Sequence, residues 1–217
     1  SLVAKGVAFG KITAHPDGML DLSGIDGVDT DLVIRPFSQK GVMTSLRQFT
    51  VNALNHHHGI QASERFGTRW TGQDDFDEDG HADEFDTDQV SAITAWQATL
   101  EPPAERVPDD PRWREAAERG SQGFDALGCA ECHVRALPLA SLRFEDPGPY
   151  DAAGTLRRGD VPAFAVYDLA LRAWAERLER NEKGEVMVPL FGDLKRHVIA
   201  DQQVAHFGNE LLAQRFV

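Results

Sequence analysis

Cysteine is scarce in this chain, which has 2 in 217 residues, Cys129 and Cys132. A structural zinc site takes two cysteine pairs, or one pair with two spaced histidines, so the absence of a third cysteine disfavours zinc. Long apolar runs are also absent: no stretch approaches the roughly 20 apolar residues that span a bilayer, and the N-terminus lacks the basic-then-apolar layout of a signal peptide. We therefore expect a soluble chain without a transmembrane segment. Its start at Ser1, without a methionine, suggests a segment of a longer protein.

Positive charge is in short supply, because 22 Lys and Arg face 35 Asp and Glu, for a net charge of −13 at pH 7. Binding to nucleic acid phosphates or to an anionic membrane needs a basic face, so we expect neither. Nine of the acids lie between Asp74 and Asp88, a stretch that contains no Lys or Arg. Most of the net acidity is therefore local and belongs to one segment.

Both cysteines belong to one short motif, Cys129-Ala130-Glu131-Cys132-His133, which has the spacing C-x-x-C-H. This spacing is typical of covalent haem c attachment. The two thiols add to the two vinyl groups of haem, and the histidine that follows supplies the proximal iron ligand. A redox dithiol or a disulfide is the main alternative, but the dithiol motif follows a buried strand in a βαβ unit. The residues before Cys129 predict a helix instead, which favours haem c.

Short strands and one helix are predicted before residue 60. Residues 3–22 alternate loosely around the turn sequence at 15–18, which indicates a β-hairpin, and residues 32–37 have the pattern of a short edge strand. A helix is predicted over 44–55, and it ends in three consecutive histidines at 56–58. Consecutive helical residues point about 100° apart, so we interpret these histidines as an exposed helix end rather than as a metal site.

A second helix, capped by Thr87 or Asp88, is predicted to run to about Leu100, and the proline-rich stretch after it indicates a linker. We place a domain boundary in this linker. The chain then consists of an α+β region over 1–107, with the hairpin, the acidic segment and the second helix, and a haem domain over 108–217.

The haem domain is expected to be helical. Residues from Trp113 to Leu127 have helical spacing and lead directly into C-x-x-C-H, which is how a small cytochrome c domain begins. A glycine inside a helix costs about 1 kcal/mol relative to alanine, so Gly120 suggests that another helix crosses closely there. Arg135 to Pro162 should form a long loop, Phe164 to Leu171 is ambiguous between strand and helix, and Val186 to Phe191 should form a short strand. Further helices are expected over 172–180, 193–199 and 209–217. The predicted fold class is mainly α with small β elements: a cytochrome c-like helical haem domain preceded by the α+β region.

The acidic segment matches the twelve-position loop of an EF-hand, with acids at positions 1, 3, 5 and 9 and a glycine at position 6. Position 12 is Asp86 in place of the usual bidentate glutamate, so either the loop tightens or Glu84 substitutes for it. A solvated acidic turn is the alternative, but so many carboxylates repel one another unless a cation lies among them. We therefore predict a structural calcium site that holds the start of the second helix. Its ligands would come from Asp75, Asp77, Asp79, His81, Asp83 and Asp86.

Several segments together resemble the di-haem cytochrome c peroxidase-like superfamily, in particular its branch of rubber oxygenases and thiol oxidoreductase-like proteins. These segments are residues 35–41, 55–61, the acidic loop with its helix, 128–133 and 189–197. Members of this family carry two C-x-x-C-H sites, whereas this chain has one, and their sequence continues past the equivalent of Val217. The resemblance therefore implies a middle piece of a larger di-haem protein, whose second haem domain lies outside this chain.

The resemblance also implies a function and a location. The haem at Cys129, Cys132 and His133 would store or relay electrons, exchange them with an electron-donor or electron-acceptor protein, and belong to a periplasmic or secreted bacterial oxidoreductase. The sixth iron ligand stays open between His197 and Met187, each of which also has an ordinary structural interpretation. Two alternative functions are consistent with the same residues. One is a non-catalytic electron-transfer cytochrome c domain, and the other is a calcium-stabilised binding module in which the dithiol is incidental.

Overall fold

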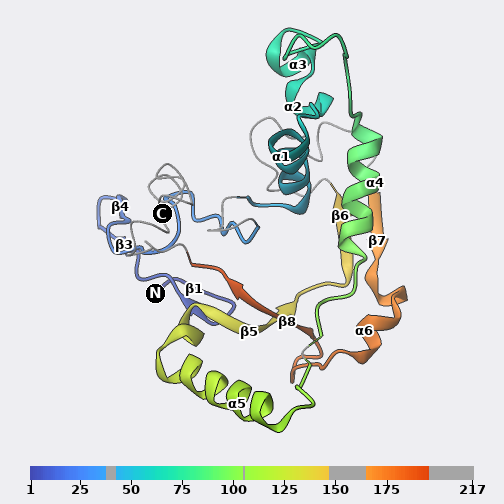
Figure 1. Ribbon diagram of the computed structural model, residues 1–217. Coiled ribbons are helices and arrows are strands. Elements are labelled where there is room, and N and C mark those ends of the chain that lie inside the picture. The colour runs from blue at the N-terminus through green and yellow to red at the C-terminus, as the bar shows by residue number, and fades with distance from the viewer. Residues whose placement is uncertain (38–42, 105, 147–164, 196–217) are drawn as a thin grey trace. The chain divides into compact units, whose positions relative to one another are not determined.

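The computed structural model describes residues 1–37, 43–104, 106–146 and 165–195 (Figure 1). The chain divides into two compact units, and each is assembled from separate stretches of sequence. The first unit takes residues 1–34, 101–140 and 178–217, and the second takes residues 35–100 and 141–177. One junction, at 100/101, lies near the domain boundary that the sequence predicts at 107/108.

The first unit contains three antiparallel strand pairs. They are β1 (Val3–Ala4) with β2 (Val7–Ala8), β3 (Thr13–Ala14) with β4 (Leu20–Asp21), and β5 (His133–Leu139) with β8 (Val186–Asp193). The predicted hairpin around residues 15–18 is confirmed as β3 and β4. The core of this unit is formed by Val7, Phe9 and Leu194, and Leu137 of β5 packs against it.

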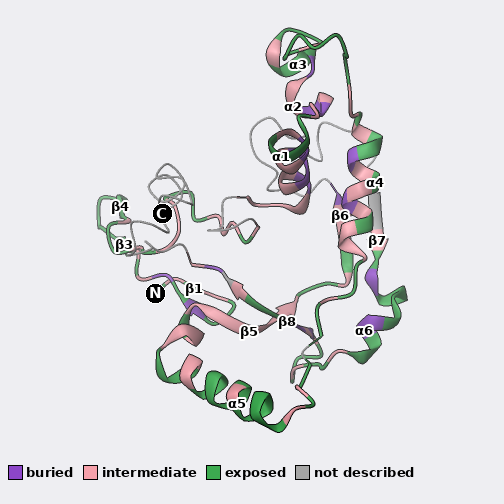
Figure 2. Cartoon of the chain, in the orientation of Figure 1, coloured by how far each residue is buried: buried purple, intermediate pink, exposed green. Residues whose placement is uncertain are grey.

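Helix α5 (Pro111–Ala126) also belongs to the first unit. The carboxylate of Asp110 accepts a hydrogen bond from the amide of Arg112, and Pro111 occupies the first turn, where a proline costs no hydrogen bond. None of its residues is buried, and Figure 2 shows most of the helix exposed. A Cβ placed on Gly120 would meet nothing within 4 Å. The prediction of a helix crossing closely at Gly120 is therefore wrong.

The second unit combines helices with one strand pair. Its elements are α1 (Leu46–His58), α2 (Ser63–Phe66), α3 (Thr68–Thr71), α4 (Thr87–Ala98), the antiparallel pair β6 (Arg143–Asp146) and β7 (Ala165–Asp168), the 3₁₀ helix η3 (Leu169–Leu171) and α6 (Ala173–Arg177). Helices α1 and α4 lie side by side (Figure 1). Val51, Ala62 and Val90 form the core between these elements.

Both long helices of the second unit begin at side-chain caps. Ser45 accepts from the amide of Gln48 and so caps α1. This helix runs three residues further than expected, through the exposed histidines 56–58, and ends at Gly59, whose φ of 70° is left-handed. Helix α4 is capped by Asp86, which forms a reciprocal pair of hydrogen bonds with Gln89, and not by either of the two caps that the sequence predicts, Thr87 or Asp88.

An ion cluster is buried in the second unit. Arg47 of α1 donates to both carboxylate oxygens of Glu64 and, at 2.5 Å, to Asp146 of β6. The three side chains are 0 to 2% exposed. Burial is the main cause that raises the pKa of Glu64 and of Asp146, and the nearby guanidinium of Arg47 opposes it. The cluster joins helix α1 to the short helix α2, 17 residues later, and to strand β6, 99 residues later.

The predicted fold class is wrong. Residues that follow the C-x-x-C-H motif form strand β5, not part of a helical haem domain, and β5 pairs with β8 over most of its length. Segment 135–146, predicted as loop, contains most of β5 and all of β6. The pairing is explained by apolar and β-branched residues that face one another, such as Leu137 with Val188 and Leu139 with Val186. Both units therefore mix helices with small antiparallel sheets.

The remaining predictions have mixed outcomes. The strand predicted at Val186–Phe191 is confirmed as part of β8. The described part of the segment that was ambiguous between strand and helix, 165–171, is strand β7 followed by η3. Residues 32–36, predicted as an edge strand, form no strand. Only residues 173–177 of the helix expected over 172–180 are α-helical. His197 and the helix expected over 209–217 lie outside the described residues. Within the described parts of the chain, no helix combines the length and the apolar character that crossing a bilayer requires.

Candidate functional sites

The C-x-x-C-H motif follows the end of α5 as a tight turn. Gly128 adopts a left-handed φ of 77°, which a residue with a side chain rarely takes, and it leads into the 3₁₀ helix η1 (Cys129–Glu131). The amide of Cys132 donates to the carbonyl of Cys129 at 3.2 Å, which closes the turn. Both cysteines are free and partly exposed. Two reduced thiols therefore lie on one turn, directly before His133.

His133 begins β5 and lies against an aromatic cluster. Its ring meets Phe124 of α5 edge-on, with centroids 6.3 Å apart, and Phe124 in turn meets Phe191 of β8 at 5.5 Å. The guanidinium of Arg135 lies 5.3 Å from the ring centre of Phe124 and 5.4 Å from that of Phe191. Phe124 thus contacts His133 directly, and Phe191 and Arg135 pack against Phe124.

A lysine lies near the motif. Lys195 forms an ion pair with Asp26 at 2.6 Å. The hydrogen bond to Asp26 is the first cause that raises the pKa of Lys195, and the charges of Cys132 and Glu131 add to it. A positive charge therefore lies within electrostatic range of the turn that carries the motif.

Exposed apolar side chains are found on the elements that flank the motif. Leu127, two residues before Cys129, is 82% exposed, and Leu190 and Phe191 of β8, the partner strand of β5, are 51% and 41% exposed. The donor set of two thiols and an imidazole within five consecutive residues fits haem that is held through thioether bonds.

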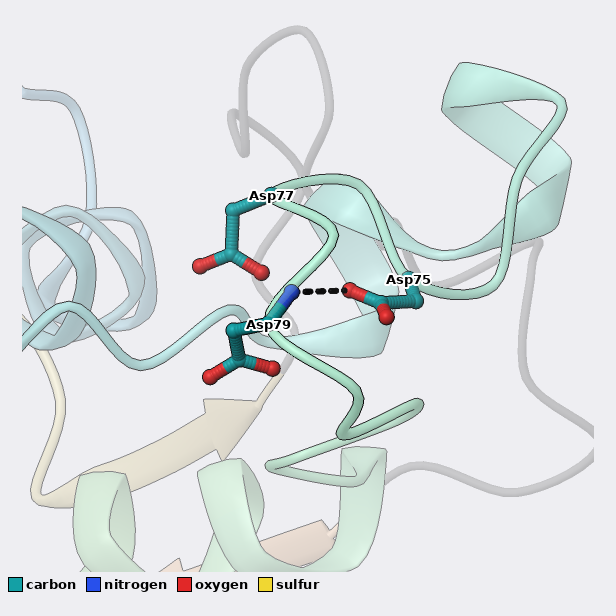
Figure 3. Close-up of side chains that lie close together, drawn as sticks. All are labelled: Asp75, Asp77 and Asp79. Atoms are coloured by element: carbon teal, nitrogen blue, oxygen red, sulfur yellow. Dashed lines mark hydrogen bonds between the residues drawn. The ribbon is translucent and has the colours of Figure 1, made fainter.

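The acidic loop brings three of the predicted calcium ligands together. One carboxylate oxygen from each of Asp75, Asp77 and Asp79 lies within 4.8 Å of the other two (Figure 3). Asp75 accepts from the amides of Asp79 and Gly80, at 3.3 and 2.9 Å, and Gly80 has the left-handed φ of 93° that the sharp turn requires. Partial desolvation, and then the charges of Asp79 and Glu84, raise the pKa of Asp77. These oxygens lie close enough together for one cation to bind all three.

The other predicted ligands lie outside this group. The carboxylate of Asp86 caps α4, and Glu84, the alternative for position 12, accepts from the amide of Gln61 at 2.7 Å. His81 and Asp83 line a small pocket with Ser63 and Phe66 instead. Among the described residues, the grouping is therefore limited to the first three acids of the loop.

Sequence reasoning missed the buried cluster of Arg47, Glu64 and Asp146. The three residues are separated by 17 positions and by more than 80, so no local spacing connects them. Their residue types gave no signal either, because Arg, Glu and Asp are almost always exposed unless they are paired.

Comparison of the chain with protein-family models, with curated proteins and with solved structures finds no match. The functional interpretation therefore depends on the residues themselves.

Proposed function

We propose that this chain is the haem c-binding part of a di-haem oxidoreductase of the peroxidase or oxygenase type, and that its haem stores or relays electrons. The observation that carries the proposal is the C-x-x-C-H motif, with two free and partly exposed thiols on one turn. The free state and partial exposure of Cys129 and Cys132, together with the exposed Leu127 two residues before them, support it. Covalent attachment of haem c implies a periplasmic or secreted protein, with a second protein as electron donor or acceptor.

Each residue of the motif has a distinct role. The thiols of Cys129 and Cys132 would hold the group through thioether bonds, and His133 would bind the iron through its imidazole. Bound haem c would supply one-electron chemistry at the iron. The left-handed Gly128 turns the chain at the end of α5, so that both thiols follow the helix on a single turn. His197, with Met187 as the alternative, would be the candidate for a further iron ligand.

The test is to express the chain with a c-type haem attachment system and to record the pyridine haemochrome spectrum. We expect covalent haem in the wild type, and loss of covalent attachment in the double variant Cys129→Ala/Cys132→Ala. The proximal ligand is tested with the variant His133→Ala. Its matched control is His57→Ala, because His57 is an exposed histidine at the end of α1. A wild-type protein without covalent haem would refute the proposal. A low-spin ferric spectrum with no peroxide or oxygen binding would favour the electron-transfer cytochrome instead.

We also propose a structural calcium site in the acidic loop. The grouping of carboxylate oxygens from Asp75, Asp77 and Asp79 within 4.8 Å supports this site. The two hydrogen bonds that backbone amides donate to Asp75 support it as well. Oxygen ligands in a turn of this kind suit calcium. A bound ion would neutralise the mutual repulsion of the acids and stabilise the loop that leads into α4.

Calcium binding is tested by thermal unfolding with calcium and with a chelator. We expect calcium to raise the melting temperature of the wild type, and this rise to be lost in Asp77→Asn. Glu78→Gln is the matched control, since Glu78 lies in the same loop outside the group of three. An equal calcium response in Asp77→Asn and in Glu78→Gln would contradict a site at these residues.

A further inference from the structure

A β-bulge interrupts the pairing of β5 with β8 immediately after Val134. Val134 pairs with Gly192 and Ala136 pairs with Pro189, so a single residue of β5, Arg135, faces two residues of β8. Bulges of this kind redirect a side chain and are often found next to functional sites. This one lies two residues from the histidine of the motif.

The bulge contains a residue in an unfavourable conformation. Phe191, one of the two residues opposite Arg135, has a φ of 48°, in the left-handed region that bulky side chains rarely adopt. Strain of this kind persists only where surrounding contacts hold it, and it is concentrated at functional sites. In this unit the ring of Phe191 contacts both Phe124, at 5.5 Å, and the guanidinium of Arg135, at 5.4 Å.

Arg135 connects the whole cluster. Its guanidinium lies over the rings of both phenylalanines, and it donates to the carboxylate of Asp125 at 3.0 Å and to the carbonyl of Ser121 at 3.0 Å. Phe124, under this guanidinium, is the ring that meets His133 edge-on at an interplanar angle of 65°. A planar group that stacks on two rings and also forms hydrogen bonds is a role that lysine cannot fill.

We propose that Arg135 is a positioning residue for His133: it holds the rings of Phe124 and Phe191 as a wall that fixes the plane of the imidazole. The inference rests on the proposed function, because the orientation of His133 matters to the chemistry only if His133 binds the haem iron. Groups around an iron ligand tune the reduction potential and the ligand field of the iron. Arg135 would therefore influence the haem without touching it.

The experiment compares variants of the full chain that carry covalent haem. Low-temperature electron paramagnetic resonance of the ferric haem reports the orientation of the imidazole, and a redox titration gives the midpoint potential. We expect Arg135→Lys and Arg135→Gln to shift both readouts. Phe191→Gly should shift them too, although glycine accepts the left-handed φ and folding should be preserved. The matched control is Arg119→Gln, an exposed arginine of α5 that pairs with Glu115 at 2.5 Å.

Three outcomes are distinguishable. Shifts in Arg135→Lys and Phe191→Gly, with none in Arg119→Gln, support the positioning role. The positioning role is overturned if Arg135→Lys and Phe191→Gly have the spectra and midpoint potentials of the wild type. It is also overturned if only Arg135→Gln shifts them, because loss of the positive charge would then explain the effect. A wild-type protein that lacks covalent haem refutes the proposed function, and this is known from its haemochrome spectrum before any variant is compared.

Discussion

Replacement of Arg47 by methionine should destabilise the second unit strongly. Arg47 is the positive member of a buried cluster with Glu64 and Asp146, and its remaining donors reach Ser91 and the carbonyl of Thr87. Methionine fills a similar volume but neutralises neither carboxylate. The variant therefore leaves two acids buried together without a counter-charge.

The magnitude follows from the cost of a buried, unpaired charge. Removal of one partner from a buried ion pair typically costs about 3 to 5 kcal/mol, and all three side chains in this cluster are almost completely buried. We expect a loss of about 3 to 5 kcal/mol in the free energy of unfolding at pH 7. The exposed pair of Arg119 and Glu115, 63% and 70% accessible, should contribute less than about 1 kcal/mol.

The loss should depend on pH. Burial already raises the pKa of Glu64 and of Asp146 above the ordinary range, against the lowering influence of Arg47. A carboxyl whose pKa is higher in the folded than in the unfolded state binds protons more tightly when folded, so stability falls as the pH rises from the ordinary carboxyl range through the raised pKa. Without Arg47 both pKa values should rise further. Protonation at pH 5 then relieves part of the repulsion, and the variant should lose less stability at pH 5 than at pH 7.

Urea unfolding of wild type, Arg47→Met and Arg119→Met at pH 5 and pH 7 measures these differences. The slope of the free energy of unfolding against urea concentration should be the same in all three proteins, so that a shift in the urea midpoint reports a change in stability. The reasoning is refuted if Arg47→Met loses no more stability at pH 7 than Arg119→Met, or if its loss is greater at pH 5 than at pH 7.

Three further predictions concern the loop, the cap and the bulge. Asp86→Ala removes the cap of α4 and should cost about 1 kcal/mol of stability in urea unfolding; an unchanged midpoint would contradict the capping role. Asp77→Asn should raise the melting temperature measured in chelator, because partial desolvation and then the charges of Asp79 and Glu84 disfavour the ionised Asp77; a lower melting temperature would contradict this. Phe191→Gly should change the free energy of unfolding by less than about 1 kcal/mol, since relief of the left-handed backbone offsets the lost ring contacts; a larger loss would show that the backbone strain is small.

Local features of the fold were predictable from the sequence because neighbouring residues determine them. The turn at 15–18 depends on a few adjacent residues and is confirmed, and the short strand predicted at Val186–Phe191 is confirmed as well. The segment after His133 was not predictable in this way. Its strand β5 depends on pairing with β8, about 50 residues later, so tertiary pairing overrides the loop-like composition of 135–146.

The candidate sites show the same difference between local features, which were predictable, and contacts between distant residues, which were not. The grouping of Asp75, Asp77 and Asp79 follows from alternate positions in one short loop, and the sequence predicted it as part of the calcium site. The wider ligand set did not follow, because Asp86 and Glu84 form hydrogen bonds with backbone amides at 2.8 and 2.7 Å. Likewise, the motif could be identified from its spacing, but the contact of Phe191 and Arg135 around it required the three-dimensional arrangement.

The core of the first unit has a consequence for the order of folding. Val7 and Phe9 lie near the beginning of the chain and Leu194 near the end of its described part, yet the three pack together. Contacts between such distant residues form late, because a long loop must close first. During synthesis, this core cannot close until Leu194 has emerged, whereas Cys129 and Cys132 emerge about 60 residues earlier. Both thiols are therefore accessible before the surrounding unit is complete, which is the interval that the proposed haem attachment would require.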